Sequence, residues 1–210
     1  MPDLSTEGAM GILRNGLMPA ACVVMLILPA QAADIKPRVR ELVTERCSLC
    51  HGVDGEAATS VYPRLAAQNE TYVVKQLKDF RDGRRKGTMN EMAKDLTDDE
   101  IAGLAGYFSG KKPQSRRPSD PDFAAVGKYI FHSGNRYSGI APCASCHGEA
   151  GRGTEQLPRL AGQHPAYVEG QLMEFVSGSR TNDKSIMHAV ATKLTTLEMK
   201  AVASYIGGLE

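Results

Sequence analysis

The apolar positions of this chain recur at the spacing of amphipathic helices. Over residues 72–80, and again over 167–175, apolar side chains fall three and four residues apart, so that they share one helix face. Residues 38–50 have similar spacing. Capping boxes, in which a threonine and a later glutamate bind the first free N–H groups, predict two further helices: Thr97 with Glu100, and Thr195 with Glu198. The pattern therefore predicts an all-α fold with little or no sheet.

These helical segments belong to an internal repeat. Residues 62–83 match residues 157–178, and residues 89–110 match residues 187–208. We expect each repeat unit to hold three or four helices joined by long loops. A domain of about 80 to 90 residues often needs a cross-link or a bound group to stabilise its fold. Long loops in so small a domain suggest that a group other than protein fills the middle.

The segment between the repeats is rich in proline, serine and charge, as exposed linkers are. The sequence accordingly predicts a first domain over residues 33–112, a linker over 113–121 and a second domain over 122–210. The whole chain has 25 basic and 24 acidic side chains, so its formal charge is near zero. This balance gives no sign of nucleic-acid binding.

A cysteine–histidine motif occurs once in each repeat, as CSLCHG over residues 47–52 and CASCHG over residues 143–148. In such a motif, two thiols one helical turn apart can each add across a vinyl group of haem, and the adjacent histidine then faces the iron. We therefore expect two covalently bound haem c groups. The predicted attachment residues are Cys47, Cys50, Cys143 and Cys146, and the predicted iron ligands of the motifs are His51 and His147.

Two other uses of these cysteines need to be weighed. A thioredoxin-like redox pair would follow a strand, whereas the segment before Cys47 has helical spacing. A structural zinc site would have only three ligands in each motif, and it would leave the methionines of the repeat unexplained.

Two methionines occupy equivalent positions after the motifs. Met89 lies 38 residues after His51, and Met187 lies 40 residues after His147. A thioether is a soft, neutral ligand that favours Fe(II), and it closes the iron to small molecules. The sequence thus predicts Met89 and Met187 as the second axial ligands. Met92 aligns with a valine, which suggests a core position, and it is the alternative to Met89 in the first repeat.

Several neighbouring residues are candidates for supporting roles. A ligand histidine usually donates its second ring N–H to a carbonyl, and we expect the carbonyls of Pro63 and Pro158 to accept these bonds. His132, His164 and His188 are not expected to bind iron. Four basic residues near the methionine loops are candidates for pairing with haem carboxylates, with solvated surface charge as the alternative reading: Arg84, Arg85, Lys86 and Arg180.

The N-terminus has the features of an export signal. Arg14 precedes an apolar run over residues 17–30, which is followed by a small-residue cleavage pattern ending at Ala32. We expect residues 1–32 to be a signal peptide removed on export to the periplasm. A retained membrane anchor is the alternative, and the run is short for one, since about 20 apolar residues span a bilayer.

The motifs PRLAAQ and PRLAGQ, each followed by a Tyr-x-x-x-Gln-Leu segment and a late methionine, resemble those of the dihaem cytochrome c4 family. The resemblance covers about residues 40–208 of the chain. It implies two tandem class I cytochrome c domains, each packed around a covalently attached haem. It carries over the same cysteine, histidine and methionine positions that are named above.

The resemblance implies a periplasmic electron carrier without catalytic residues. It would pass single electrons from the quinol-oxidising side of respiration, such as a quinol-cytochrome c reductase, to a terminal oxidase or reductase. An electron-accepting cytochrome subunit of a periplasmic dehydrogenase would share every residue named here. A dihaem peroxidase is a weaker alternative, because it needs an iron open to peroxide. We expect a monomer with redox-protein partners, and peripheral membrane association is compatible with this reading.

Overall fold

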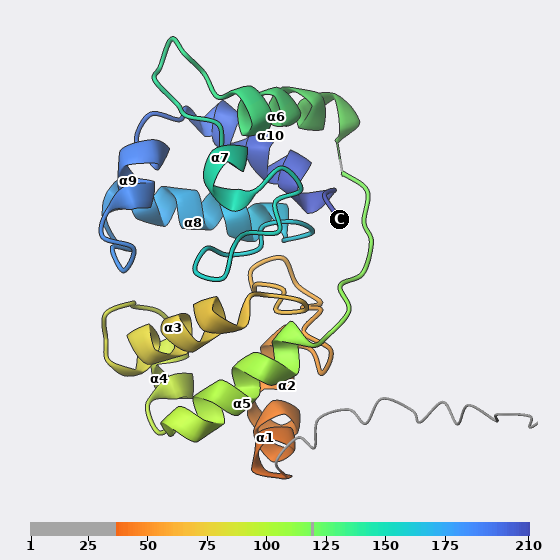
Figure 1. Cartoon of the computed structure of the whole chain (residues 1–210), viewed down its shortest axis with the longest axis vertical. Helices are drawn as coiled ribbons and strands as arrows, with labels where there is room; N and C mark the ends of the chain where they lie inside the picture. Colours follow the sequence, from red (N-terminus) through yellow and green to blue (C-terminus); the bar gives the residue numbers. More distant parts are fainter. Residues whose placement is uncertain (1–36, 119) are drawn as a thin grey trace, which may run out of the picture. The chain divides into compact units, whose positions relative to one another are not determined.

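The computed structural model describes residues 37–118 and 120–210, and the expected signal peptide over residues 1–32 lies outside them. Helices form two groups, joined by the extended segment between α5 and α6 (Figure 1). No strand occurs in the described parts of the chain, where the one isolated β-bridge joins Asn135 to Ile140. The prediction of an all-α protein is confirmed. None of the helices among these residues is long and apolar enough to cross a membrane.

The first group of helices begins with a continuous helical run that changes its pitch. This run is formed by α1 (Pro37–Leu42), a π-helical segment η1 (Val43–Cys47) and α2 (Ser48–His51). It is followed by α3 (Glu70–Arg81), α4 (Met89–Ala93) and α5 (Asp98–Ser109). The π-helical turn ends at the first cysteine of the first motif, and such turns are frequent at functional sites.

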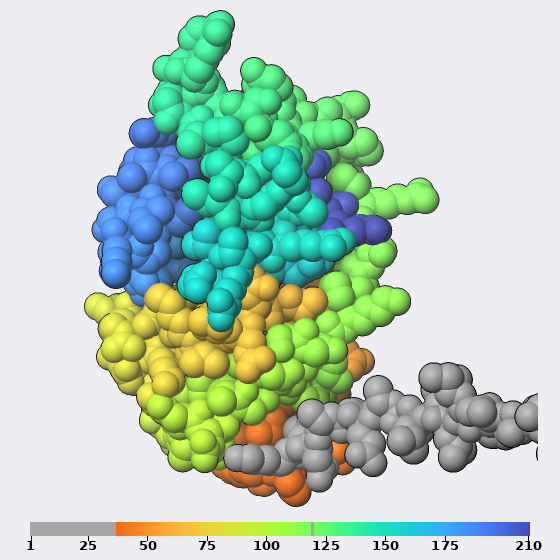
Figure 2. Space-filling model, in the orientation of Figure 1, coloured from red at the N-terminus to blue at the C-terminus, as the bar shows by residue number. Residues whose placement is uncertain are grey.

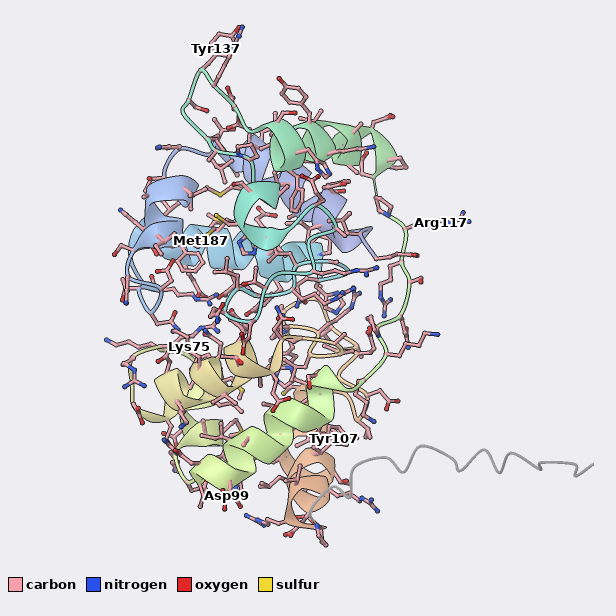
Figure 3. All side chains as sticks on the ribbon, in the orientation of Figure 1. Lys75, Asp99, Tyr107, Arg117, Tyr137 and Met187 are labelled. Carbon is pink, nitrogen blue, oxygen red and sulfur yellow. The ribbon has the colours of Figure 1, made fainter. Side chains whose placement is uncertain are left out.

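The second group has the same order of helices with a longer first connection. It contains α6 (Pro121–Ser133), α7 (Ala144–His147), α8 (Pro165–Ser177), α9 (Ile186–Ala191) and α10 (Thr196–Gly207). A loop separates α6 from α7, where the first group has its π-helical turn. This loop stands out from the surface in Figure 2, and Tyr137 at its tip is 86% exposed (Figure 3).

The caps predicted from the sequence are formed. Thr97 accepts a hydrogen bond from the backbone N–H of Glu100 at 3.2 Å, and the Glu100 carboxylate accepts one from the Thr97 N–H at 2.8 Å. Thr195 and Glu198 repeat this arrangement at the start of α10 with the same two distances. Each box satisfies N–H groups that would otherwise lack a partner, so the last helix of each group has a fixed start.

Each group of helices encloses its own apolar core. One core is built from α1, η1, α3, α4 and α5, and the other from α6 to α10. In the second group α6 crosses α10 at Gly127, where a Cβ would lie 1.9 Å from the carbonyl oxygen of Ala201. Only glycine permits this backbone approach. Both groups belong to one compact unit.

Candidate cofactor sites at the two cysteine–histidine motifs

The two cysteines of each motif are placed one helical turn apart. Cys47 ends the π-helical segment, and Cys50 lies on α2; Cys143 caps α7, and Cys146 lies on it. None of the four is joined to another cysteine in a disulfide. Residues three apart share a helix face, so each motif presents its two thiols on one side of its helix. The first thiol of each pair packs against the apolar core of its group, whereas Cys146 is exposed.

The first thiol of each motif is a poor nucleophile on its own. Burial raises the pKa of Cys47 to about 11, and it raises the pKa of Cys143 to about 11 as well. Both sulfurs are thus protonated at neutral pH, whereas a reactive redox cysteine needs a lowered pKa. Among residues 37–118 and 120–210, no three His, Cys, Asp or Glu side chains are arranged to hold a metal ion. The raised pKa of each first thiol gives the thioredoxin reading no support.

The motif histidines are buried and held in one orientation. His51 Nδ1 lies 2.9 Å from the carbonyl oxygen of Pro63, and His147 Nδ1 lies 3.2 Å from that of Pro158. A carbonyl can only accept, so Nδ1–H is the donor in both rings. Burial lowers the pKa of both histidines. The result is two neutral imidazoles whose Nε2 atoms keep a free lone pair, as a metal-ligating histidine requires.

The two repeat-equivalent methionines start the short helices of their groups. Met89 is the first residue of α4, and it packs against the same core cluster as Cys47. Met187 lies near the start of α9 and packs against the same core cluster as Cys143 (Figure 3). Met92 is 38% exposed, so its side chain is directed more toward solvent than a core position requires.

Each methionine helix is anchored by a side chain that the sequence analysis did not assign. Asn90 donates from Nδ2 to the carbonyl oxygen of Phe80 at 2.5 Å. His188, its repeat equivalent, bonds through Nδ1 to the carbonyl oxygen of Phe175 at 2.7 Å. The two positions perform the same task with different residue types. His188 is thus occupied in holding the loop that carries Met187.

The turn before Met187 is locally strained. Lys184 and Ser185 have φ angles of 59° and 62°, which non-glycine residues rarely adopt. The carboxylate of Asp183 accepts a hydrogen bond from the Met187 N–H at 2.6 Å and fixes the start of α9. Strain of this kind persists where the surroundings impose it, often at functional sites. Here it sets the position of the methionine.

The repeated Pro-Arg-Leu-Ala-x-Gln motifs contact each other. Gln68 accepts a bond from the Arg159 N–H at 2.7 Å and donates to the Arg159 carbonyl at 2.9 Å. Gln163 forms the reciprocal pair with the N–H and carbonyl of Arg64 at 2.8 and 3.0 Å. The two motifs therefore join the two helix groups along a seam. This role was missed from the sequence, although the motif stood out as a repeat beyond the cysteines.

The donor set of each group fits a haem held through two thioethers. Each group offers two thiols one turn apart, a neutral buried histidine with a free Nε2, and a methionine thioether against the same core. Haem c uses this combination of donors.

Comparisons with known proteins agree with this donor set. Residues 124–210 match the family described as Cytochrome c, and residues 36–108 match the family described as Cytochrome C oxidase, cbb3-type, subunit III. Cytochrome c4 of Pseudomonas aeruginosa is 39% identical over 168 residues, covering 78% of this chain and 83% of that protein. A thiosulfate dehydrogenase electron acceptor of Thiomonas intermedia is 37% identical, covering 76% of each chain. The structure of reduced recombinant cytochrome c4 from Pseudomonas stutzeri matches with a TM-score of 0.78 at 37% identity, covering 82% of this chain and 97% of that one.

Proposed function

The chain belongs to the cytochrome c4 family, and we propose that it carries single electrons between redox proteins of the periplasm. It has two cytochrome c domains and binds two covalently attached haem c groups. The proposed domain limits are residues 33–112 and 122–210, with a linker over 113–121. In support, α5 ends at Ser109 and α6 begins at Pro121.

The proposed attachment residues are the four motif cysteines, each forming a thioether: Cys47, Cys50, Cys143 and Cys146. The proposed axial ligands are His51 with Met89 in the first domain, and His147 with Met187 in the second. Pro63 and Pro158 are proposed to fix the histidine tautomers through their carbonyls. The bound haem iron supplies a one-electron couple.

The observation that carries this proposal is the shared placement of the two methionines. Each packs against the core cluster of its own motif, and each is held there by an anchored short helix. A methionine on the iron leaves no position for a substrate, and it favours Fe(II). A closed iron supports electron transfer and disfavours a peroxidase. No catalytic residue is proposed.

The test replaces one methionine at a time in the holoprotein. Met89→Ala and Met187→Ala should each remove about half of the far-red sulfur-to-iron absorption band, because each opens one of two irons. Each variant should also gain carbon monoxide binding at one haem per chain. Met92→Ala is the matched control on the same helix as Met89, and it should keep the full band. If Met92→Ala lost the band while Met89→Ala kept it, the ligand of the first domain would be Met92.

A second candidate function is electron acceptance from a periplasmic dehydrogenase. The observation that favours it is the 37% identity to a thiosulfate dehydrogenase electron acceptor. Rapid-mixing reduction separates the two candidates. Faster reduction by a thiosulfate dehydrogenase catalytic subunit than by a quinol-oxidising complex would favour the acceptor role, and the reverse order would favour the respiratory carrier.

Export to the periplasm is proposed from the signal-like pattern that ends at Ala32. Thioether attachment and electron exchange with periplasmic partners both fit this location. We further propose a monomer that meets its partners at the membrane surface or in solution. The mass of the mature holoprotein should correspond to a chain that starts at Ala33, and an uncleaved N-terminus would contradict export by this signal.

A further inference from the structure

Four large apolar side chains of the first domain are exposed beside its cysteine–histidine motif. Leu49 and Val61 are 81% and 68% exposed, and Val53 and Tyr62 are exposed as well. Leu49 lies within the motif, between its two cysteines, and Val53 follows the motif histidine by two positions. Single exposed apolar residues are common, whereas a group of them around one site indicates an interaction surface. These four residues are called the apolar patch below.

Contacts with the motif and with α5 fix the loop residues of the patch. The ring centroid of Tyr62 lies 6.2 Å from that of His51, in an edge-to-face arrangement. Pro63, the next residue, bonds to the His51 ring through its carbonyl oxygen at 2.9 Å. The carbonyl oxygen of Val53 accepts a hydrogen bond from the hydroxyl of Tyr107 at 2.9 Å. The patch is therefore a formed surface next to the proposed ligand histidine.

The second domain does not repeat this surface. It carries exposed polar side chains at three of the four equivalent positions: Ser145 for Leu49, Glu149 for Val53, and Gln156 for Val61. The fourth equivalent is Leu157. The side chain of Glu149 is 86% exposed, so a carboxylate faces solvent where the first domain has a valine. The two motifs share their cysteines and histidines, so the attachment of haem does not account for the patch.

The charges within this stretch of the first domain are neutralised by the protein itself. Each charged side chain of residues 46–62 is in an ion pair: Arg46 with Asp95, Asp54 with Lys111, and Glu56 with Arg64 and Arg116. The fields of opposite charges this close together largely cancel at a distance. The stretch therefore offers little net charge that could steer a charged partner.

We propose that the apolar patch is the docking surface for a redox protein whose own docking face is apolar and uncharged. The inference rests on the proposed function, because the docked protein would exchange electrons with the haem of the first domain. Apolar surface leaves water favourably against apolar surface, whereas a charged face would lose hydration here without gaining a counter-charge. The polar surface at the second motif does not fit the same partner. The two domains thus differ in which proteins they meet.

This partner chemistry predicts two properties of the complex. Its affinity should change little with ionic strength, because complexes that depend on opposite charges weaken as salt screens them. Its affinity should depend on the individual side chains of the patch. Loss of one large apolar side chain from the docked surface should weaken binding by about tenfold.

The experiment maps the binding of a blue copper protein whose copper lies beneath an apolar, uncharged surface. Both proteins are fully reduced, so that no electron passes, and nuclear magnetic resonance follows the amide signals of the isotope-labelled holoprotein. The signals of residues 49–62 should shift when the copper protein is added, at low and at high salt alike. The signals of residues 143–157, around the second motif, should stay in place. Shifts at both motifs, no shift at residues 49–62, or binding that high salt abolishes would overturn the inference.

Variants that copy the second domain test the patch directly. Leu49→Ser and Val61→Gln each install the residue of the equivalent position at an exposed site, so the core is left intact. Each should weaken binding by about tenfold. Leu197→Ser is the matched control, since it removes the same apolar side chain from a 65% exposed position of α10 in the second domain. This control should bind like the wild type. Unchanged binding in Leu49→Ser and Val61→Gln, or equal weakening in Leu197→Ser, would also overturn the inference.

Failure of the inference differs from failure of the proposed function. Shifts confined to other surfaces, with the sulfur-to-iron band at full strength, reject only the docking surface. A wild type without the band rejects the proposed iron ligands. The binding map needs no electron transfer, so it decides on the docking surface in either case.

Discussion

At the scale of single residues, repeat-equivalent side chains share tasks even where their types differ. Asn90 and His188 both bond to the phenylalanine carbonyl that precedes the methionine loop. Matching one repeat to the other identified the cysteines, histidines and methionines because these types are the same in both. The comparison of the repeats could not identify the asparagine–histidine pair, because an amide and an imidazole are different residue types. Their shared role shows only when each is seen to bond to the equivalent phenylalanine carbonyl of its own repeat.

We predict that His164 makes one half of the seam sensitive to pH. Its repeat equivalent is Asn69, whose side chain has no titratable group. His164 is 9% exposed; its Nε2–H donates to the Ala57 carbonyl at 2.8 Å, and its Nδ1 accepts from Arg64 at 3.1 Å. Its pKa is lowered by burial first, and by the charges of Arg64 and Arg116, whereas the Ala57 carbonyl and Glu56 act in the opposite sense.

The sign of the pH effect follows from this lowered pKa. The folded state prefers the neutral ring, so the stabilisation is present above the ordinary histidine pKa of about 6.5 and is lost as pH falls below it. The free energy of unfolding should decrease there by at most about 1.4 kcal/mol per pH unit from this group. His164→Asn, which copies the other half of the seam, should remove this part of the pH dependence.

Denaturant unfolding of the holoprotein between about pH 5 and about pH 8 measures the effect as the difference between wild type and His164→Asn. Above about pH 7.5, roughly one unit over the ordinary histidine pKa, the ring is neutral in both states and the two proteins should have parallel pH profiles. Parallel profiles at lower pH as well would show that His164 titrates equally in the folded and unfolded states.

At the scale of elements, the helical periodicity placed the long helices well, but it did not show how they cross. The apolar face over residues 167–175 lies within α8, and both predicted capping boxes start helices. The split between α6 and α7 was not foreseen. The local pattern of residues near Cys143 does not show that a projecting loop replaces the π-helical turn of the first domain. Loop geometry of this kind depends on contacts made elsewhere in the fold.

The crossing of α6 and α10 depends on Gly127. An alanine Cβ would lie 1.9 Å from the Ala201 carbonyl oxygen and 2.5 Å from its carbon, so the two helices would have to separate. Overpacking of this kind should lower the free energy of unfolding by about 2 to 3 kcal/mol. Gly170→Ala in α8 is the control, because nothing lies within 4 Å of its added Cβ. It should be neutral or stabilise by about 0.5 to 1 kcal/mol. Equal stability of the two variants would show that the crossing does not need the glycine.

At the scale of the whole molecule, the two domains are joined by their repeated motifs. Gln68 and Gln163 each bind the backbone of the other domain's Pro-Arg-Leu segment. The repeat itself was visible in the sequence, and so were the residues that we propose as donors to each haem. Their mutual contact was not, because a bond such as that between Arg64 and Gln163, which lie 99 positions apart, leaves no local periodicity. What links the two redox sites therefore had to come from the structure.

The account depends on two closed irons per chain, each bound by a histidine and a methionine. The most direct measurement is the absorption spectrum of the fully reduced wild-type holoprotein before and after addition of carbon monoxide. We predict two low-spin haems per chain and no spectral change on addition of the gas, because the thioethers of Met89 and Met187 occupy the position where it would bind. A carbon monoxide complex at either haem would contradict the account, since at least one iron would then be open to a small molecule.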